Sequence, residues 1–249
     1  MNSLIVVKLG GSLIGNERVK NKFIKELIEI SSRQSVILVH GGGPEINELL
    51  NKFSITSKFI DGLRFTDKNI ISVVEMALSG KVNRNLITAL IKNGANAVGI
   101  SGKDGQSIIC KRIKKFGFVG EPVKINKKLF NILINHNFLP VVASIASDIY
   151  GNVLNVNADT MATFIAIAFK ADKLIFLTDV EGVLDNNKKL LNELKIKDVD
   201  NMIRKKIITG GMIPKVKGCV DSIKKGIKEV WIIGEKGSIQ KTKGTVIKK

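Results

Sequence analysis

Residues 4–12 read LIVVKLGGS and residues 35–43 read SVILVHGGG, and these two stretches decide the fold. Each is a short run of aliphatic and β-branched residues that ends in consecutive glycines, and a stretch with helical periodicity follows each one. Apolar runs of this length without polar alternation are typical of strands that are buried on both faces of a parallel sheet. The two stretches therefore predict β–turn–α units of an α/β protein.

The same alternation continues along the chain and predicts the fold class. Strands are expected at 4–8 and 35–40 and, further along, at 97–100, 138–143, 173–177 and 230–233, and helices are expected at 19–31 and 45–53. Segments with period-2 patterning flank glycines at about 108–125 and 148–155, and such segments predict β-hairpins. We therefore predict an α/β fold, a three-layer αβα sandwich around a mostly parallel central sheet with appended β-hairpins.

Length and composition indicate a single globular domain. The chain has 249 residues, of which 44% are hydrophobic, and this fraction is too high for a disordered protein. No linker, repeat or low-complexity tract divides the chain, so we expect one domain over residues 1–249, with an N-terminal and a C-terminal lobe.

The compartment follows from what the chain lacks. No apolar run reaches the roughly 18 residues of a spanning helix, and the N-terminus has no basic region of a signal peptide. Cys110 and Cys219 stand far apart and form no CxxC pair, so metal and redox chemistry are not expected. We expect a cytoplasmic protein with no membrane partner.

The charge balance is strongly basic, with 40 Lys and Arg against 22 Asp and Glu, and this raises the question of nucleic-acid binding. The lysines are spread along the chain, the aromatic fraction is 5%, and no RNP, zinc-finger or homeodomain pattern occurs. A solvated lysine-rich surface is therefore favoured over a nucleic-acid partner. An anionic substrate would be attracted by the same field.

Three glycine turns are the candidate anion-binding segments. Gly10–Gly11 and Gly41–Gly43 follow strands, and Gly210–Gly211 precedes a helical stretch. Consecutive glycines let backbone N–H groups approach phosphate or carboxylate oxygens. Neither GxGxxG nor GxxxxGK[ST] occurs, so a standard dinucleotide site and a P-loop are excluded. Any one turn alone is equally consistent with a tight strand–helix connection, whereas three turns favour anion binding.

Three charged residues near these turns are candidates for catalysis. Lys8 ends an apolar strand, where a lysine is costly unless it meets an anion or extends to the rim. Lys215 falls in the first turn of an expected helix, where a cation opposes the helix dipole. Asp159 opens an apolar helix, either as a carboxylate stabilised by the dipole or as an acid that orients the lysines.

An ordered series of motifs covers almost the whole chain and resembles one family. The series is KLGGSLI, VHGGGPEIN, GLRFTD, GKVNRNL, AVGISGKDG, PVVASIA, NVNADTMA, LTDVEGVL and TGGMIPKV. In this order it resembles the amino acid kinase family, and HGGGPEIN with GLRFTD and NVNAD points to its acetylglutamate kinase branch. The first and last segments are shared more widely in the family.

The resemblance implies a role for each matching position. Lys8 and Lys215 would stabilise the transferring phosphoryl group, and Asp159 would hold the two lysines. Gly42 and Gly43 would cradle the reacting groups, Arg64 would pair with a substrate carboxylate, and Asn155 would bind the amino-acid end. Gly11 would approach the phosphates, and the nucleotide would lie against Asp179, Val180, Glu181, Gly182, Val183, Leu184, Ile207, Ile208 and Thr209.

The implied reaction is phosphorylation of the γ-carboxylate of N-acetyl-L-glutamate by ATP, the second step of arginine biosynthesis. A carboxylate is ionised at neutral pH and is its own nucleophile, so no catalytic histidine is needed, and His40 could instead fix its turn. Mg²⁺ would arrive on ATP, and we expect no protein-bound metal site. The lobe at about 1–155 would bind the acid and dimerise, and that at about 156–249 would bind ATP. Arginine-inhibited members carry an N-terminal helix that is missing here, so we expect an arginine-insensitive homodimer.

Three alternatives remain open from the sequence. The first is a related kinase for glutamate or aminoadipate that is attached to an acidic carrier protein, which the basic charge would suit. The second is another acid or phosphate kinase of the family. The third is a non-catalytic binding module, which would be expected to lack at least one of Lys8, Asp159 and Lys215, although all three are present.

Overall fold

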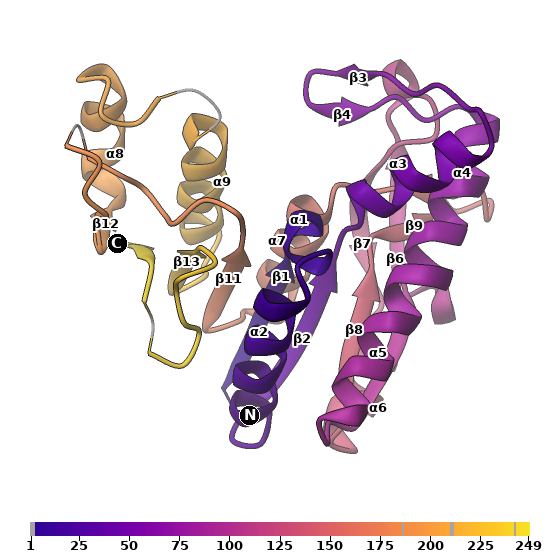
Figure 1. The fold of residues 1–249 in the computed structure, drawn as a ribbon, viewed down its shortest axis with the longest axis horizontal. Coiled ribbons are helices and arrows are strands. Elements are labelled where there is room, and N and C mark those ends of the chain that lie inside the picture. Colours follow the sequence, from indigo (N-terminus) through magenta and orange to yellow (C-terminus); the bar gives the residue numbers. More distant parts are fainter. Residues whose placement is uncertain (1–2, 186, 210–211, 242) are drawn as a thin grey trace.

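The computed structural model describes residues 3–185, 187–209, 212–241 and 243–249 (Figure 1). Its central sheet consists of β1 (Leu4–Leu9), β2 (Ser35–His40), β5 (Ala97–Ser101), β8 (Leu139–Ala143), β11 (Lys173–Leu177), β12 (Glu193–Lys195), β13 (Glu229–Ile233) and β14 (Thr245–Lys248). The spatial order is β12-β14-β13-β11-β1-β2-β8-β5, and every neighbouring pair is parallel except β13 and β14. The predicted mostly parallel sheet is confirmed, and β1 and β2 lie near its middle.

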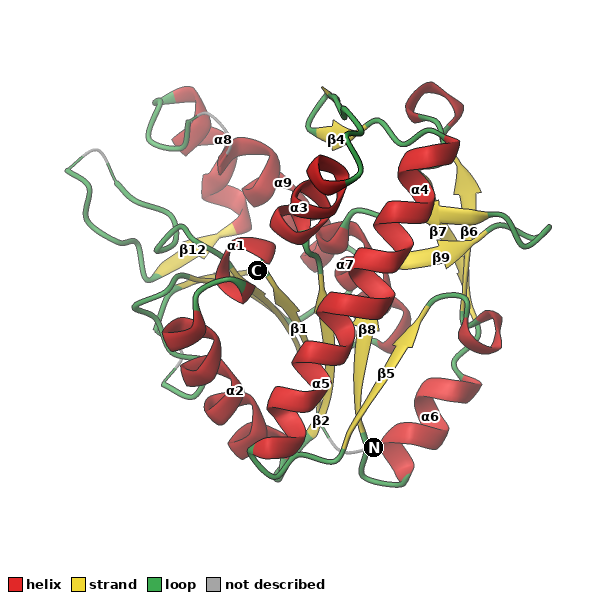
Figure 2. Cartoon of the chain, turned by 45° about the vertical axis from the view of Figure 1, so that its right-hand side comes forward, coloured by secondary structure: helices red, strands yellow, loops and turns green. Residues whose placement is uncertain are grey.

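Helices cover both faces of this sheet. One face carries α1 (Gly11–Ile14), α2 (Glu17–Ser31) and α5 (Asn83–Lys92), and the other carries α6 (Lys128–Asn135), α7 (Ala158–Phe169), α8 (Ile196–Arg204) and α9 (Met212–Lys224). Figure 2 shows α2 and α5 lying across the sheet. In the described part of the chain, no helix is long and apolar enough to cross a membrane.

Strand β1 shows why the two faces can both be apolar. Its residues Ile5, Val7 and Leu9 pack in the apolar cluster that includes α2, whereas Val6 packs in the cluster that includes α7. Successive side chains of a strand point to opposite faces, so a continuous apolar run serves both layers. Lys8 follows the same alternation and therefore lies on the α7 face.

The predicted hairpins form a second sheet. Strands β6 (Ile108–Arg112) and β7 (Gly120–Ile125) pair antiparallel, as do β9 (Ile145–Ser147) and β10 (Val153–Asn155). The two pairs join through β6 and β9 in the order β10-β9-β6-β7. A small hairpin of β3 (Phe59–Ile60) and β4 (Leu63–Arg64) stands apart, and short 3₁₀ turns occur at η2 (Asp104–Gln106) and η3 (Lys114–Phe116).

A long helical segment with an internal change of pitch backs the glycine turn after β2. It runs through α4 (Lys68–Glu75), the π-helical turn η1 (Met76–Val82) and α5, and it packs on α3 (Gly43–Lys52). A π-helical turn is wider than an α-helical one and is frequent at functional sites. This turn was not foreseen from the sequence.

Helix starts differ from the predicted ones for local reasons. Helix α2 begins at Glu17 instead of residue 19, because the Asn16 side chain accepts a hydrogen bond from the Val19 amide and caps the first turn. Helix α3 begins at Gly43 instead of residue 45, and Pro44 is accommodated in its first turn, where its missing N–H is not needed.

Candidate active site

The glycine turns after β1 and β2 meet at the carboxyl edge of the sheet. The strands are parallel neighbours in which Leu9 stands opposite His40, so the turns that follow lie side by side. A Cβ atom at Gly11 would lie 3.0 Å from the Gly43 nitrogen and 3.3 Å from the Gly42 nitrogen. Only glycine at position 11 leaves the space in front of these two amides open. The same amides begin α3, so the positive end of the helix dipole also faces this space.

Lys8 and Asp159 form an ion pair beside the glycine turns. Lys8 reaches from β1 to Asp159 in the first turn of α7, and its Nζ lies 2.8 Å from Asp159 Oδ1. The lysine side chain is 13% exposed, and that carboxylate oxygen is buried without a hydrogen-bond partner among the residues described. The contact is therefore an ion pair without hydrogen-bond alignment, and it compensates the Lys8 charge.

Lys215 shares this space but has a neutral partner. It extends from the first turn of α9, and its Nζ donates a 3.0 Å hydrogen bond to Thr178 Oγ1, which in turn donates to Asp179 Oδ1 at 3.0 Å. Burial lowers the pKa of Lys215, the charge of Asp159 raises it, and the charge of Lys8 lowers it. The ion pairs of the described residues include none between Lys215 and Asp159. The structure thus brings the three predicted residues together, and among the described residues the ion pair of Asp159 is with Lys8.

Thr178 was not identified from the sequence. It directly follows strand β11, whose carboxyl end adjoins that of β1. Its position immediately before the predicted Asp179 was the available signal, because polar residues at the ends of parallel strands share one edge of the sheet.

Arg64 lies at the end of β4 and is 7% exposed. Its two amino groups donate to Ser57 Oγ at 2.5 Å and to Asn47 Oδ1 at 2.6 Å, and its guanidinium stacks 4.7 Å from the centre of the Phe59 ring. Burial lowers its pKa, and the ion pairs found among the described residues do not include it. The site therefore holds a buried cation on neutral groups, which favours an anionic ligand. Asn47 and Ser57 were missed from the sequence, although Asn47 ends the HGGGPEIN motif.

Asn155 is joined to the Arg64 segment through a buried threonine. Its Nδ2 donates to Thr66 Oγ1 at 3.1 Å, and the Thr66 hydroxyl donates to the Arg64 carbonyl at 2.9 Å. The backbone N–H of Asn155 also donates to the Phe118 carbonyl at 2.8 Å. Two motifs that are far apart in the sequence thus form one wall, with Arg64 and Asn155 on it.

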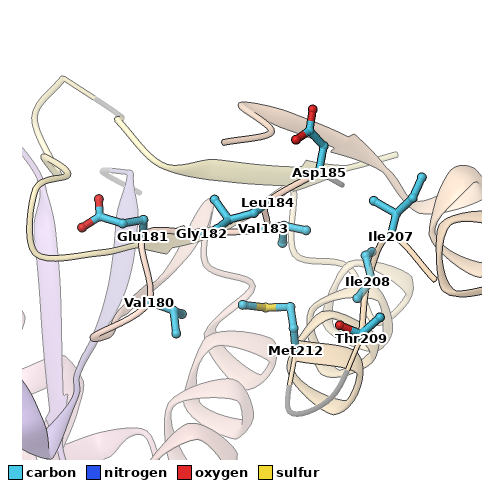
Figure 3. A pocket seen from close by; sticks show the side chains of 10 residues that line it. All are labelled: Val180, Glu181, Gly182, Val183, Leu184, Asp185, Ile207, Ile208, Thr209 and Met212. Atoms are coloured by element: carbon cyan, nitrogen blue, oxygen red, sulfur yellow. The ribbon is translucent and has the colours of Figure 1, made fainter. Parts of the chain in front are cut away.

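A cavity of about 370 Å³ lies between the segment after β11 and the start of α9 (Figure 3). It is lined by Val180, Glu181, Gly182, Val183, Leu184, Asp185, Ile207, Ile208, Thr209 and Met212. The two predicted nucleotide-binding runs therefore come together, but Asp179 is not among the lining residues and bonds to Thr178 instead. Asp185 and Met212 were not predicted. The predicted Gly210–Gly211 turn lies outside the described residues.

The shape of this cavity depends on a glycine with a positive φ. Gly182 has φ +141°, and a Cβ there would lie 2.5 Å from Thr245 Oγ1. The same hydroxyl accepts a 2.9 Å hydrogen bond from the Val183 amide. Strand β14 thus holds the predicted nucleotide-binding run against the sheet.

Comparison with known proteins agrees with this arrangement. The family model described as "Amino acid kinase family" matches residues 3–234. The chain is 65% identical to the acetylglutamate kinase of Endomicrobium trichonymphae over the full length of both proteins. It is 42% identical to the acetylglutamate kinase of Archaeoglobus fulgidus, over 93% of this chain and 86% of that protein.

A solved structure is similar over the whole fold. The crystal structure of a Streptococcus mutans UA159 protein superimposes with a TM-score of 0.83 and 30% sequence identity, over 100% of this chain and 99% of that one. The predicted fold class and resemblance are thereby confirmed. The chain belongs to the amino acid kinase family, in the branch of the acetylglutamate kinases.

Proposed function

We propose that this protein is an acetylglutamate kinase that transfers the γ-phosphoryl group of ATP to the γ-carboxylate of N-acetyl-L-glutamate in arginine biosynthesis. The observation that carries the proposal is the 65% identity with a curated acetylglutamate kinase, which extends over both complete chains. The geometry is compatible with it, because lysines, glycine amides and a buried arginine surround one edge of the sheet.

The acid is proposed to bind at the wall that carries Arg64 and Asn155. The Arg64 guanidinium would exchange its neutral partners Asn47 and Ser57 for a substrate carboxylate, which it can bind with two parallel hydrogen bonds. The Asn155 Nδ2 donates to Thr66, and the hydrogen bonds of the described residues include none to its Oδ1, which would accept a hydrogen bond from the substrate amide.

In the proposed reaction, a γ-carboxylate oxygen attacks the γ-phosphorus in line. The new O–P bond forms as the bond to the β–γ bridging oxygen breaks, and ADP leaves with that electron pair. Lys8 and Lys215 neutralise the charge on the transferring group, while Asp159 keeps Lys8 in place. The amides of Gly42 and Gly43 donate to the reacting oxygens. No proton has to be removed from the acid.

ATP is proposed to place its base and ribose in the cavity beside α9 and its phosphates at Gly11. The opening in front of the Gly42 and Gly43 amides, which a Cβ at Gly11 would fill, fits a phosphate group. Asp159 and Asp179 are engaged by Lys8 and Thr178, so we assign Mg²⁺ to the ATP phosphates rather than to a carboxylate cluster. The ion would neutralise charge on the phosphate oxygens.

The remaining assignments extend the same proposal. The lobe at about 1–155 binds the acid and forms a homodimer, and the lobe at about 156–249 binds ATP. The enzyme works in the cytoplasm on a free small molecule, without a nucleic-acid or membrane partner.

The test is a coupled ADP-release assay with MgATP and N-acetyl-L-glutamate, in which hydroxylamine traps the acyl phosphate. Glutamate, aspartate and N-acetylaminoadipate serve as comparison substrates. We expect turnover and trapping with N-acetylglutamate alone. A folded protein that binds ATP but turns over no free acid would contradict the proposal and favour a carrier-bound substrate.

A further inference from the structure

A buried histidine stands where the second glycine turn begins. His40 ends β2 and is fully buried, with its Nδ1 2.9 Å from the Gly41 carbonyl oxygen and its Nε2 2.9 Å from Asn83 Nδ2. A carbonyl oxygen only accepts hydrogen bonds and an amide nitrogen only donates them. The partners therefore assign the proton to Nδ1 and the lone pair to Nε2 of a neutral imidazole.

The orientation of Asn83 is fixed by a second set of bonds. Its Nδ2 also donates to the Val141 carbonyl at 3.0 Å, and its Oδ1 accepts from Arg84 Nη2 at 2.7 Å. Arg84 donates further to the Gly99 carbonyl at 3.2 Å. Asn83 is fully buried, so this network ties the helix after η1 to β8 and β5 and determines which way its amide points.

The bond from His40 also determines where the next amide points. The Gly41 carbonyl and the Gly42 N–H belong to the same planar trans peptide, so they point in opposite directions. Holding the carbonyl against the His40 ring therefore directs the Gly42 N–H away from that ring. The Gly42 nitrogen would lie 3.3 Å from a Cβ at Gly11, which places it at the opening proposed for phosphate.

The π-helical turn closes the remaining side. A Cβ at Gly42 would lie 2.8 Å from Leu78 Cδ2 and 2.9 Å from Val82 Cγ2, both in η1. Asn83 follows η1 directly, so one helical segment packs on the back of Gly42 and also supplies the bond to His40. The glycine turn at Gly41–Gly43 thus has little room to rotate.

We propose that His40 and Asn83 are positioning residues that aim the Gly42 amide at the transferring phosphoryl group. This inference rests on the proposed kinase function. Neither side chain touches the substrate, and both act through the Gly41–Gly42 peptide.

The imidazole can serve this role because it stays neutral. Burial lowers the pKa of His40, the bond to Gly41 raises it and the charge of Arg84 lowers it, and together they bring it to about 4. Arg84, which donates to the Asn83 side chain, is the charged residue that lowers this pKa, and the strand neighbours Leu9 and Ala143 are apolar. The His40 ring of the wild-type enzyme should show no titration in the neutral range.

The variant Asn83→Asp tests the proposal, because a carboxylate cannot donate to His40 Nε2. The neutral ring should move its proton to Nε2, which leaves the Nδ1 lone pair facing the Gly41 carbonyl. We expect kcat to fall about 10²-fold near pH 8, the scale of loss from a small misplacement, with KM for ATP unchanged. The new carboxylate also raises the pKa of His40, so kcat of the variant should recover toward about pH 6 as the doubly protonated ring regains its Nδ1 proton.

Ser107→Ala is the matched control, because Ser107 is a fully buried hydrogen-bonding residue outside the site. The variant Asn83→Ala provides a second test without a buried charge, with thermal unfolding to show that it is folded. A kcat for either Asn83 variant within a factor of two of the control would overturn the proposal. For Asn83→Asp, a loss of kcat that is the same at every pH would also overturn it. A loss of stability alone would lower Tm and the fraction of active enzyme, with KM unchanged for both substrates.

Nitrogen-15 NMR of the wild-type protein tests which ring nitrogen of His40 carries the proton, even if the variants do not fold. The chain has two histidines, so the ring signals can be assigned readily. A proton on Nδ1 of His40 at neutral pH is expected, and a proton on Nε2 contradicts the inference. Absence of turnover by the wild-type enzyme with this proton on Nδ1 would instead refute the proposed kinase function.

Discussion

The two lysines of the site are held in different ways. Lys8 sits on a central strand between β2 and β11, and its charge is compensated by Asp159 at 2.8 Å. Lys215 sits at the start of a helix, where it bonds to the neutral Thr178 hydroxyl and its pKa is lowered by burial. Lys8 is therefore paired with a carboxylate, whereas the ion pairs found among the described residues include none for Lys215.

The difference suggests that Lys8 and Lys215 contribute to phosphate binding in different ways. Lys8 has a defined position on its strand, but Asp159 already compensates part of its charge, so it attracts a phosphate less strongly. A desolvated, poorly compensated charge gains more from an arriving phosphate, because the ligand removes the cost of its burial. Arg64 resembles Lys215 in this respect, since it is buried on neutral partners.

The largest expected effects come from removing either lysine. Lys8→Met and Lys215→Met should each lower kcat about 10²–10³-fold, by analogy with the loss of one oxyanion donor. Steady-state ADP release measures this, with the exposed Lys25→Met as control. Thermal unfolding extends the comparison. Lys8→Met should lower Tm because it leaves the Asp159 carboxylate without its ion-pair partner, whereas Lys215→Met should not lower Tm. Near-normal turnover of either variant would show that the lysine is dispensable.

Replacing Arg64 tests whether the second buried cation binds the acid. Arg64→Lys keeps the charge but loses the planar two-pronged geometry, so KM for N-acetylglutamate should rise about 10–100-fold. KM for ATP should change far less. Equal increases in both constants would mean that Arg64 does not bind the acid.

Asp159→Asn addresses the link between the two lysines. It removes the ion-pair partner that keeps Lys8 in place, and we expect kcat to fall about tenfold, which corresponds to about 1.4 kcal/mol in the activation free energy. The charge of Asp159 raises the pKa of Lys215, so its removal should lower that pKa further. The alkaline limb of the kcat profile should then move to lower pH. An unmoved limb would show that the two groups act independently.

The smallest expected effect is a pH-dependent difference in stability. Because burial lowers the pKa of Lys215, the unfolded chain binds this proton more tightly, and the ionised side chain opposes folding below the folded-state pKa. This cost fades as pH rises from that pKa toward the ordinary value. Relative to Lys215→Met, wild type should therefore gain unfolding free energy in the alkaline range. The gain is at most about 1.4 kcal/mol for each tenfold difference in proton affinity between the folded and unfolded chains, and less after solvent screening. Urea unfolding at several pH values measures it, and a constant difference would contradict the burial argument.

Much of the fold was predictable because the core strands are locally encoded. The runs at 35–40 and 173–177 were predicted with the bounds that the structure shows, since an apolar run between turn residues has few other interpretations. The short edge strand β12 and the π-helical turn η1 were not foreseen. Both depend on packing against distant segments, which no local pattern records.

The site was predictable where it coincides with motifs. Lys8, Asp159 and Lys215 lie together as the resemblance implied, although their catalytic roles stay predictions. Thr178, Asn47 and Ser57 were missed because their importance arises only from contacts across 37, 17 and 7 residues of sequence.

The sequence by itself determined the layered α/β architecture and the family, because strand hydrophobicity and ordered motifs are properties of contiguous residues. Only the tertiary structure decided which partner each charge has. It paired Asp159 with Lys8 rather than with Lys215, placed Gly11 before the Gly42 and Gly43 amides, and set the proton of His40 through Asn83. Hydrogen bonds and ion pairs act over a few ångströms between segments that are distant in the chain, so folding has to bring them together before their chemistry exists.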